Sequence, residues 1–216
     1  MSNRINWKQF WVDMLGVLIG ITIAFQLQNW KENRANNSVR EQYLINLSSD
    51  LYQDSLELQA MVDTMQHQTR MMSLLVRDMY SPQPSDSIFE HTMGMFSASR
   101  FDAFNTTYQS MISSGDMKLI KNFELRKEII DLYERQHFEI EAFDESHLNV
   151  FYDHIYPVLY EDVIFTGPRN LQNVEFLKDP KFVNLAHANN GLLQRKLSAY
   201  EKALTATTAL REKLRE

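Results

Sequence analysis

Residues 10–27 read FWVDMLGVLIGITIAFQL, and this stretch decides how the rest of the chain is arranged. A helix of this length spans about 27 Å, just enough to cross a hydrocarbon core of about 30 Å. Asp13 and Gln26 lie near its two ends, where polar side chains reach the lipid headgroups. A buried core helix is the alternative, but charged residues flank the stretch on both sides. A cleaved signal peptide is disfavoured because no small-residue cleavage site follows. We therefore predict a single transmembrane helix.

All three tryptophans of the chain lie within or beside this helix. Tryptophan gathers at membrane–water interfaces, and Trp11 and Trp30 are about 28 Å apart along a helix. We therefore predict that both anchor the helix at the interfaces, with Trp7 just outside. The predicted organisation is a short tail over residues 1–9, a transmembrane helix over residues 10–30, and one soluble helical domain over residues 31–216.

Small residues recur every four positions within the predicted span, at Gly16, Gly20 and Ala24. This spacing forms a smooth ridge that allows two helix backbones to approach closely in lipid. The ridge predicts association with a second copy of the chain or with another membrane subunit. The alternative is that glycine is simply common in membrane spans.

The charges beside the span do not decide its orientation. Arg4 and Lys8 precede it, and Lys31, Arg34 and Arg40 follow it. We place the span in a bacterial inner membrane with the soluble domain in the periplasm, since only a short basic tail would stay in the cytoplasm. The absence of cysteine also suits an oxidising compartment. A cytoplasmic domain is the alternative.

A heptad pattern follows the span and predicts a long helix that ends near residue 80. One seam of this pattern is apolar at every seventh position, namely Leu44, Leu51, Leu58, Met65, Met72 and Met79. The second seam contains Leu47, Met61 and Leu75 but is interrupted by Asp54 and Gln68. Residues 36–38 (NNS) form either a polar break before this helix or a stretch through which the span's helix continues, since neither proline nor glycine intervenes.

Helix caps and breakers divide the rest of the chain. Gly115 is expected to end a short helix in the left-handed conformation, and Asn122 is expected to cap the next long helix. Pro157 should end or kink that helix. Asp179 should cap a last helix over residues 180–214. Residues 81–87 and 167–168 are expected loops, with a short helix between residues 88 and 97. Without a sustained alternating pattern, the prediction is an all-α, antiparallel up-and-down bundle.

Two segments resemble an uncharacterised family of bacterial envelope proteins with a single membrane span. The first is GVLIGITIAFQLQNWKENR, residues 16–34, and the second is TYQSMISSGDMKLIKNFELRKEIIDLYE, residues 107–134. The family is of unknown function. The resemblance implies a membrane-anchored architecture and a bacterial membrane location, and it implies no reaction or ligand.

The densest polar cluster lies on the predicted helix that starts at Asn122. It comprises Glu134, His137, Glu141, Asp144 and His147. A carboxylate three residues from a histidine is the ligand unit of di-metal helical bundles, but those sites combine two helices. Here both pairs lie on one helix about 15 Å apart, so they cannot share one metal pair. A solvated acidic face is therefore preferred to a metal site.

Other features exclude several classes of function. No phosphate loop, nucleophile elbow or HExxH motif is present. The net charge is −6, and no basic patch appears, so nucleic acid is not an expected partner. The favoured hypothesis is an interaction or scaffold subunit of a bacterial envelope complex, which is not an enzyme and has no cofactor. The alternatives are a ligand-sensing bundle with a pocket between residues 133 and 160, and a metal-dependent enzyme.

Overall fold

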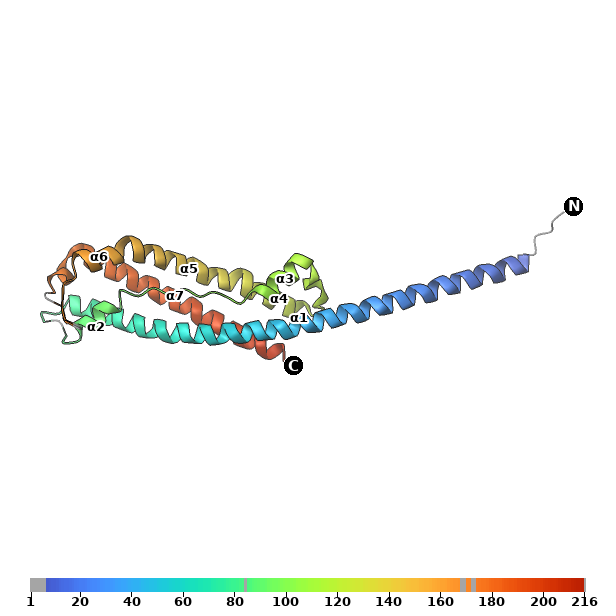
Figure 1. Ribbon diagram of the computed structural model, residues 1–216, viewed down its shortest axis with the longest axis horizontal. Coiled ribbons are helices and arrows are strands. Elements are labelled where there is room, and N and C mark those ends of the chain that lie inside the picture. The colour runs from blue at the N-terminus through green and yellow to red at the C-terminus, as the bar shows by residue number, and fades with distance from the viewer. Residues whose placement is uncertain (1–6, 84, 168–169, 172–173, 216) are drawn as a thin grey trace.

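The computed structural model describes residues 7–83, 85–167, 170–171 and 174–215 (Figure 1). Its first element is one unbroken helix, α1 (Trp7–Met79), of 73 residues. Such a helix is about 110 Å long. The polar break considered at residues 36–38 does not form, and the helix continues through it. The physical reason is local, because the sequence contains no glycine or proline between Gly20 and Pro82.

The two halves of α1 have different surroundings. Figure 1 shows the N-terminal half projecting away from the rest of the molecule, while the C-terminal half lies within the bundle. This helix is long and apolar enough to cross a membrane, and its apolar window is entirely exposed. In contrast, the seam residues from Leu51 to Met79 are buried. Of the predicted tail over residues 1–9, residues 1–6 lie outside the described residues, and residues 7–9 belong to α1.

The bundle contains three long helical elements. Besides α1, these are α7 (Pro180–Lys213) and a composite helix. The composite helix consists of α4 (Phe123–Asp131), the π-helical turn η2 (Leu132–Gln136), α5 (His137–Val150), the π-helical turn η3 (Phe151–Ile155) and α6 (Tyr156–Glu161). The all-α class is confirmed. Short elements complete the fold: α2 (Ile88–Met93), α3 (Thr106–Ser114), the 3₁₀ turns η1 (Asp116–Leu119) and η4 (Glu175–Lys178), and the paired strands β1 (Phe165–Gly167) and β2 (Asn170–Leu171).

The path of the chain departs from a simple up-and-down order at one place. After α2 and a turn, residues 97–105 form an extended segment, here called the strap, which returns along the bundle to α3 (Figure 1). The composite helix therefore runs parallel to α1, and α7 runs antiparallel to both. The core residues reflect this order, since Leu47 packs with Ile129 and Leu210 at one end, and Met79 packs with Ile155 and Phe182 at the other.

Most of the predicted helix boundaries are correct, but the short helix expected between residues 88 and 97 ends at Met93. Gly115 has a φ of 73° after α3, and the Asn122 and Asp179 side chains each accept two backbone N–H groups at the starts of α4 and α7. Pro157, however, does not end its helix, which continues to Glu161. The irregularity precedes the proline, because the turn η3 ends two residues before it. A π-helical turn allows the helix to pass a residue that has no N–H to donate.

Candidate functional site

A buried polar network holds the strap between α5 and α7. The Asp144 carboxylate lies 3.0 Å from the Lys196 ammonium group and accepts hydrogen bonds from the Tyr200 hydroxyl and from the Phe101 backbone N–H at 2.9 Å. The Lys196 ammonium group also donates to the Ser99 carbonyl oxygen. The Lys196 side chain is 0% exposed. Two charges from different helices are therefore neutralised by each other and by the backbone of the strap.

His147 completes this network on the α5 side. Its Nδ1 lies 3.4 Å from the Lys196 ammonium nitrogen and can accept a hydrogen bond from it. Burial, with a smaller contribution from the positive charge of Lys196, lowers the pKa of His147 to about 4. Burial also lowers the pKa of Lys196, while the charge of Asp144 opposes that shift. A neutral His147 therefore serves as an acceptor beside the ion pair.

The strap is also held by α1, through the two polar residues that interrupt its second seam. The Gln68 amide donates to the Ser97 carbonyl oxygen at 2.6 Å, and the Asp54 carboxylate accepts the Phe104 N–H at 2.7 Å. The pKa of Asp54 is raised to about 7. Burial is the main cause, the hydrogen bond from the Phe104 N–H opposes the rise, and the nearby charge of Asp50 contributes to it. Asp54 and Gln68, which interrupt the apolar seam, therefore hold the strap against α1 through hydrogen bonds to its backbone.

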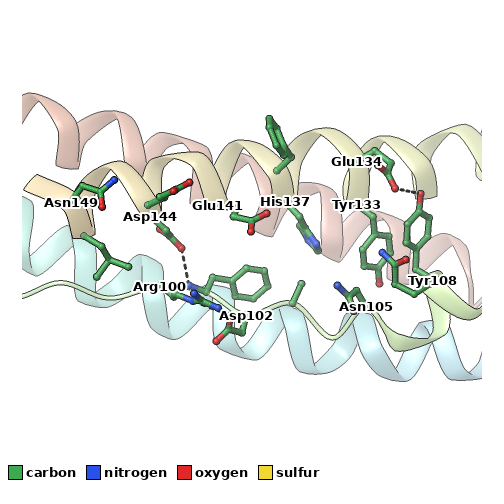
Figure 2. A pocket seen from close by; sticks show the side chains of 16 residues that line it. Arg100, Asp102, Asn105, Tyr108, Tyr133, Glu134, His137, Glu141, Asp144 and Asn149 are labelled. Carbon is green, nitrogen blue, oxygen red and sulfur yellow. Dashed lines mark hydrogen bonds and ion pairs between the residues drawn. The ribbon is translucent and has the colours of Figure 1, made fainter.

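A groove of about 660 Å³ lies beside this network, between the strap, α3 and the composite helix. Figure 2 shows the side chains that line it, with the strap on one side and α5 on the other. Its polar lining residues are Arg100, Asp102, Asn105, Tyr108, Gln109, Tyr133, Glu134, His137, Glu141, Asp144, Glu145 and Asn149. Four of the five residues of the predicted polar cluster therefore line one groove, while His147 belongs to the buried network behind it.

The cluster is only partly the solvated acidic face predicted for it. Glu134 and Glu141 are exposed, as predicted, but His137, Asp144 and His147 are buried. Only the tertiary structure could show this difference, because the partners of Asp144 come from α7 and the strap. Lys196 and Tyr200 were missed by the sequence analysis. One signal in the sequence could have revealed the pair of Asp144 and Lys196. The helical repeat places Lys196 on the face of the last helix that is otherwise buried, where an unpaired lysine is rare.

His137 is the least satisfied polar group of the groove. It is 8% exposed, and neither of its ring nitrogens has a hydrogen-bond partner within the described residues. The ring packs edge-on against Phe101 and Tyr133, with centroids 5.4 and 5.0 Å away. Burial lowers the pKa of His137 to about 4, so the ring is neutral at pH 7. A neutral imidazole offers one donor and one acceptor, and both are unused here.

The predicted carboxylate–histidine pairs do not converge. Glu134 accepts a hydrogen bond from the Tyr108 hydroxyl at 2.7 Å, and its partner in sequence, His137, turns toward the strap (Figure 2). Among the described residues, no group of three or more histidine, aspartate or glutamate side chains could hold a metal ion.

The apolar window of the predicted span is not buried against the rest of the chain. Gly16 and Gly20 have no atom within 4 Å of the position that a Cβ would occupy, and Ala24 is exposed. Trp11 and Trp30 are also exposed, and the Arg34 guanidinium lies 5.6 Å from the centre of the Trp30 ring. Trp7 is the first residue of α1, but its side chain lies outside the described part of the chain. The ridge is thus available to a partner.

The fold and the groove together define a class of protein: a helical bundle, braced by an extended strap, whose first helix carries a segment able to cross a membrane. The sequence over residues 13–187 matches the Family of unknown function (DUF6090), and the chain belongs to that family. This agrees with the resemblance to an uncharacterised family of envelope proteins. Comparison with curated proteins and with solved structures finds no match.

Proposed function

We propose that the protein is a membrane-anchored interaction subunit of a bacterial envelope complex and not an enzyme. The observation that carries this proposal is the continuity of α1, which connects the exposed apolar segment directly to the core of the bundle. A protein that only needed to be tethered could use a flexible linker. A continuous helix instead gives the bundle a defined direction relative to the membrane.

The geometry of α1 supports a stiff connection. Residues 31–42, here called the stalk, lie between the span and Tyr43, whose hydroxyl donates to Asp116 of η1 at 3.2 Å. Twelve helical residues hold the bundle about 18 Å from the end of the span. Sharp helix kinks arise at proline, glycine or inserted groups, and the stalk contains neither of these residues. A rotation of the span would therefore turn the bundle with it.

The association that we propose uses the ridge of Gly16, Gly20 and Ala24. Its test is the crosslinking of a Leu27→Cys variant in membranes, which is clean because the chain has no cysteine of its own. Leu27 lies one turn after Ala24 on the same helix face. Gly20→Leu should lower the yield of crosslinked dimer, because the leucine side chain keeps a second helix from approaching the ridge closely. The substitution should not disturb the single chain, since nothing else in the chain lies near this position.

The matched control is Thr22→Leu, which places a leucine on the opposite face of the span. Undiminished crosslinking in Gly20→Leu would remove the ridge from the proposal, and so would an equal loss in both variants. If Leu27→Cys gives no crosslink between two copies, the expected partner is a different membrane subunit. Purification of the full chain from membranes should then recover that subunit in stoichiometric amount.

The bundle is proposed to lie in the periplasm, with the N-terminus in the cytoplasm and the span in the inner membrane. The absence of cysteine supports this orientation, because stray thiols are a liability in an oxidising compartment. Protease added to spheroplasts tests it. The bundle should be degraded while the inner membrane is intact, and survival until that membrane is broken would place the bundle in the cytoplasm.

A second candidate function is favoured by the groove beside α5. In this function the bundle senses a ligand and passes the signal through α1 to a partner in the membrane. The groove's volume of about 660 Å³ falls within the range typical of small-molecule sites. Its walls are the strap and α5, and the strap is attached to all three long helices. A ligand that moves the strap would therefore act on the whole bundle.

A further inference from the structure

The groove carries a row of carboxylates along one wall. Glu134, Glu141 and Glu145 lie on the face of the composite helix that lines the groove, and all three are exposed. Residues four and seven positions apart on a helix are separated by about 6 and 10 Å along its axis. Within the described residues, neither Glu141 nor Glu145 forms an ion pair, and neither accepts a hydrogen bond. Their negative charge is thus available to a ligand.

The remaining charges of the groove do not cancel this row. Asp144 is neutralised by Lys196, and Arg100 forms an ion pair with Asp102, its neighbour on the strap. The groove therefore keeps a net negative charge and would repel phosphate or carboxylate ligands. A single divalent ion is also a poor match, because the described residues contain no group of three or more carboxylate or histidine side chains placed to hold one.

His137 provides a second and independent indication of a ligand. Its ring lines the groove, it is 8% exposed, and both of its nitrogens lack a hydrogen-bond partner among the described residues. Buried polar groups without partners are rare and costly, and they recur where a ligand completes the set. Figure 2 shows the ring directed from the composite helix toward the strap, between Glu141 and Tyr133.

Aromatic rings complete the lining at the same end. Tyr108 and Tyr133 stack with centroids 4.4 Å apart, and both line the groove with Phe138, which is largely exposed. Tyr108 and Tyr133 are buried, so of these three rings it is the exposed Phe138 that offers a face to an ammonium group or to an aliphatic chain. A negative row, an unused acceptor nitrogen and aromatic surface therefore occur together in one groove.

We propose that this groove binds a linear organic cation with two or more ammonium groups, of the aliphatic polyamine class. An ammonium group is a donor with no acceptor, which complements acceptor-only carboxylates and the acceptor nitrogen of His137. Amino groups separated by short alkyl chains match the spacing of the glutamates along the helix. Rotation of the His137 ring about its side-chain bonds turns its acceptor nitrogen to the ligand. A polyamine would be the ligand of the ligand-sensing function proposed above. Only the use of binding as a signal rests on that function, and binding itself does not.

The test is calorimetric titration of the full chain, in nanodiscs of uncharged lipid, with spermidine. Saturable binding at one site per chain is expected. The double variant Glu141→Gln, Glu145→Gln should weaken binding about tenfold, which is about 1.4 kcal/mol, because it removes two of the three exposed carboxylates of the row. The matched control is Glu139→Gln, which removes a carboxylate from the same helix outside the groove. It should bind as the unmodified chain does.

Three further measurements distinguish this site from nonspecific attraction of cations to an acidic protein. His137→Phe keeps the ring packing, so it should fold normally by circular dichroism and bind spermidine more weakly. Equal competition by Mg²⁺ at the same ionic strength, equal weakening in Glu139→Gln, or binding of a lysine-rich peptide but not of spermidine would overturn the proposal. Binding that leaves Leu27→Cys crosslinking unchanged would retain the site and reject the sensing function.

Discussion

Replacing Lys196 by methionine should destabilise the bundle strongly. The substitution nearly preserves the length of the side chain but removes the charge that compensates Asp144, and both side chains are almost fully buried. Removing one partner of a buried ion pair typically costs about 3–5 kcal/mol, because the other charge is left uncompensated. Asp144 keeps the Tyr200 hydroxyl and the Phe101 N–H as donors, so we expect a loss at the lower end, about 3 kcal/mol.

The measurement is urea unfolding of the full chain in detergent micelles, followed by circular dichroism. With an m-value of about 2 kcal/mol/M, a loss of about 3 kcal/mol lowers the midpoint by roughly 1.5 M. The matched control is Lys202→Met, which removes an exposed lysine from the same helix and should leave the midpoint nearly unchanged.

A double variant isolates the ion pair from the loss of packing. Lys196→Met combined with Asp144→Asn should lose less stability than the two single variants added together, because the uncompensated charge is gone. A loss below about 1 kcal/mol in Lys196→Met, or strict additivity in the double variant, would show that the pair does not hold the strap in place.

Three further predictions concern single residues. Gly94→Ala should lower stability by about 1–3 kcal/mol in urea unfolding, because the added Cβ would overlap the Cβ of Met71; an unchanged midpoint would contradict this. Asn122→Ala should cost about 1 kcal/mol through the lost cap of α4, whereas Asn122→Asp should retain most of it. The pKa of Asp54 is raised from 3.8 to about 7 on folding, so its contribution to stability is present at low pH and is lost as pH rises through about 7. Asp54→Asn should remove this dependence, which is at most about 1.4 kcal/mol per pH unit between pH 4 and 7, and an unchanged slope would refute it.

Local signals predicted the helix ends because the groups that satisfy a helix terminus come from neighbouring residues. Asn122 and Asp179 cap their helices through backbone N–H groups two and three positions later, and Gly115 takes the left-handed conformation at the end of α3. Pro157 shows the limit of such signals. A π-helical turn just before it changes the hydrogen-bond pattern of the helix, and nothing in the residue types nearby indicates that turn.

The candidate site was predicted only in part. The five residues from Glu134 to His147 were singled out as one polar cluster, and four of them line the groove. The opposing wall is the strap, an irregular segment without periodicity, so its position along the bundle had no signal in the sequence. The polar interruptions Asp54 and Gln68 marked where the strap attaches, but only as departures from a pattern.

The amino-acid sequence by itself determined the all-α class, the segment able to cross a membrane and the register of the long first helix. These depend on apolar periodicity and on caps, which act over a few residues along the chain. The tertiary structure alone decided that the composite helix runs parallel to α1, that Lys196 neutralises Asp144, and that His137 is buried with its nitrogens unused. These depend on contacts between residues far apart in the chain, as between positions 144 and 196. Whether a carboxylate is solvated or buried and paired is settled by which helix packs against it, not by its own neighbours.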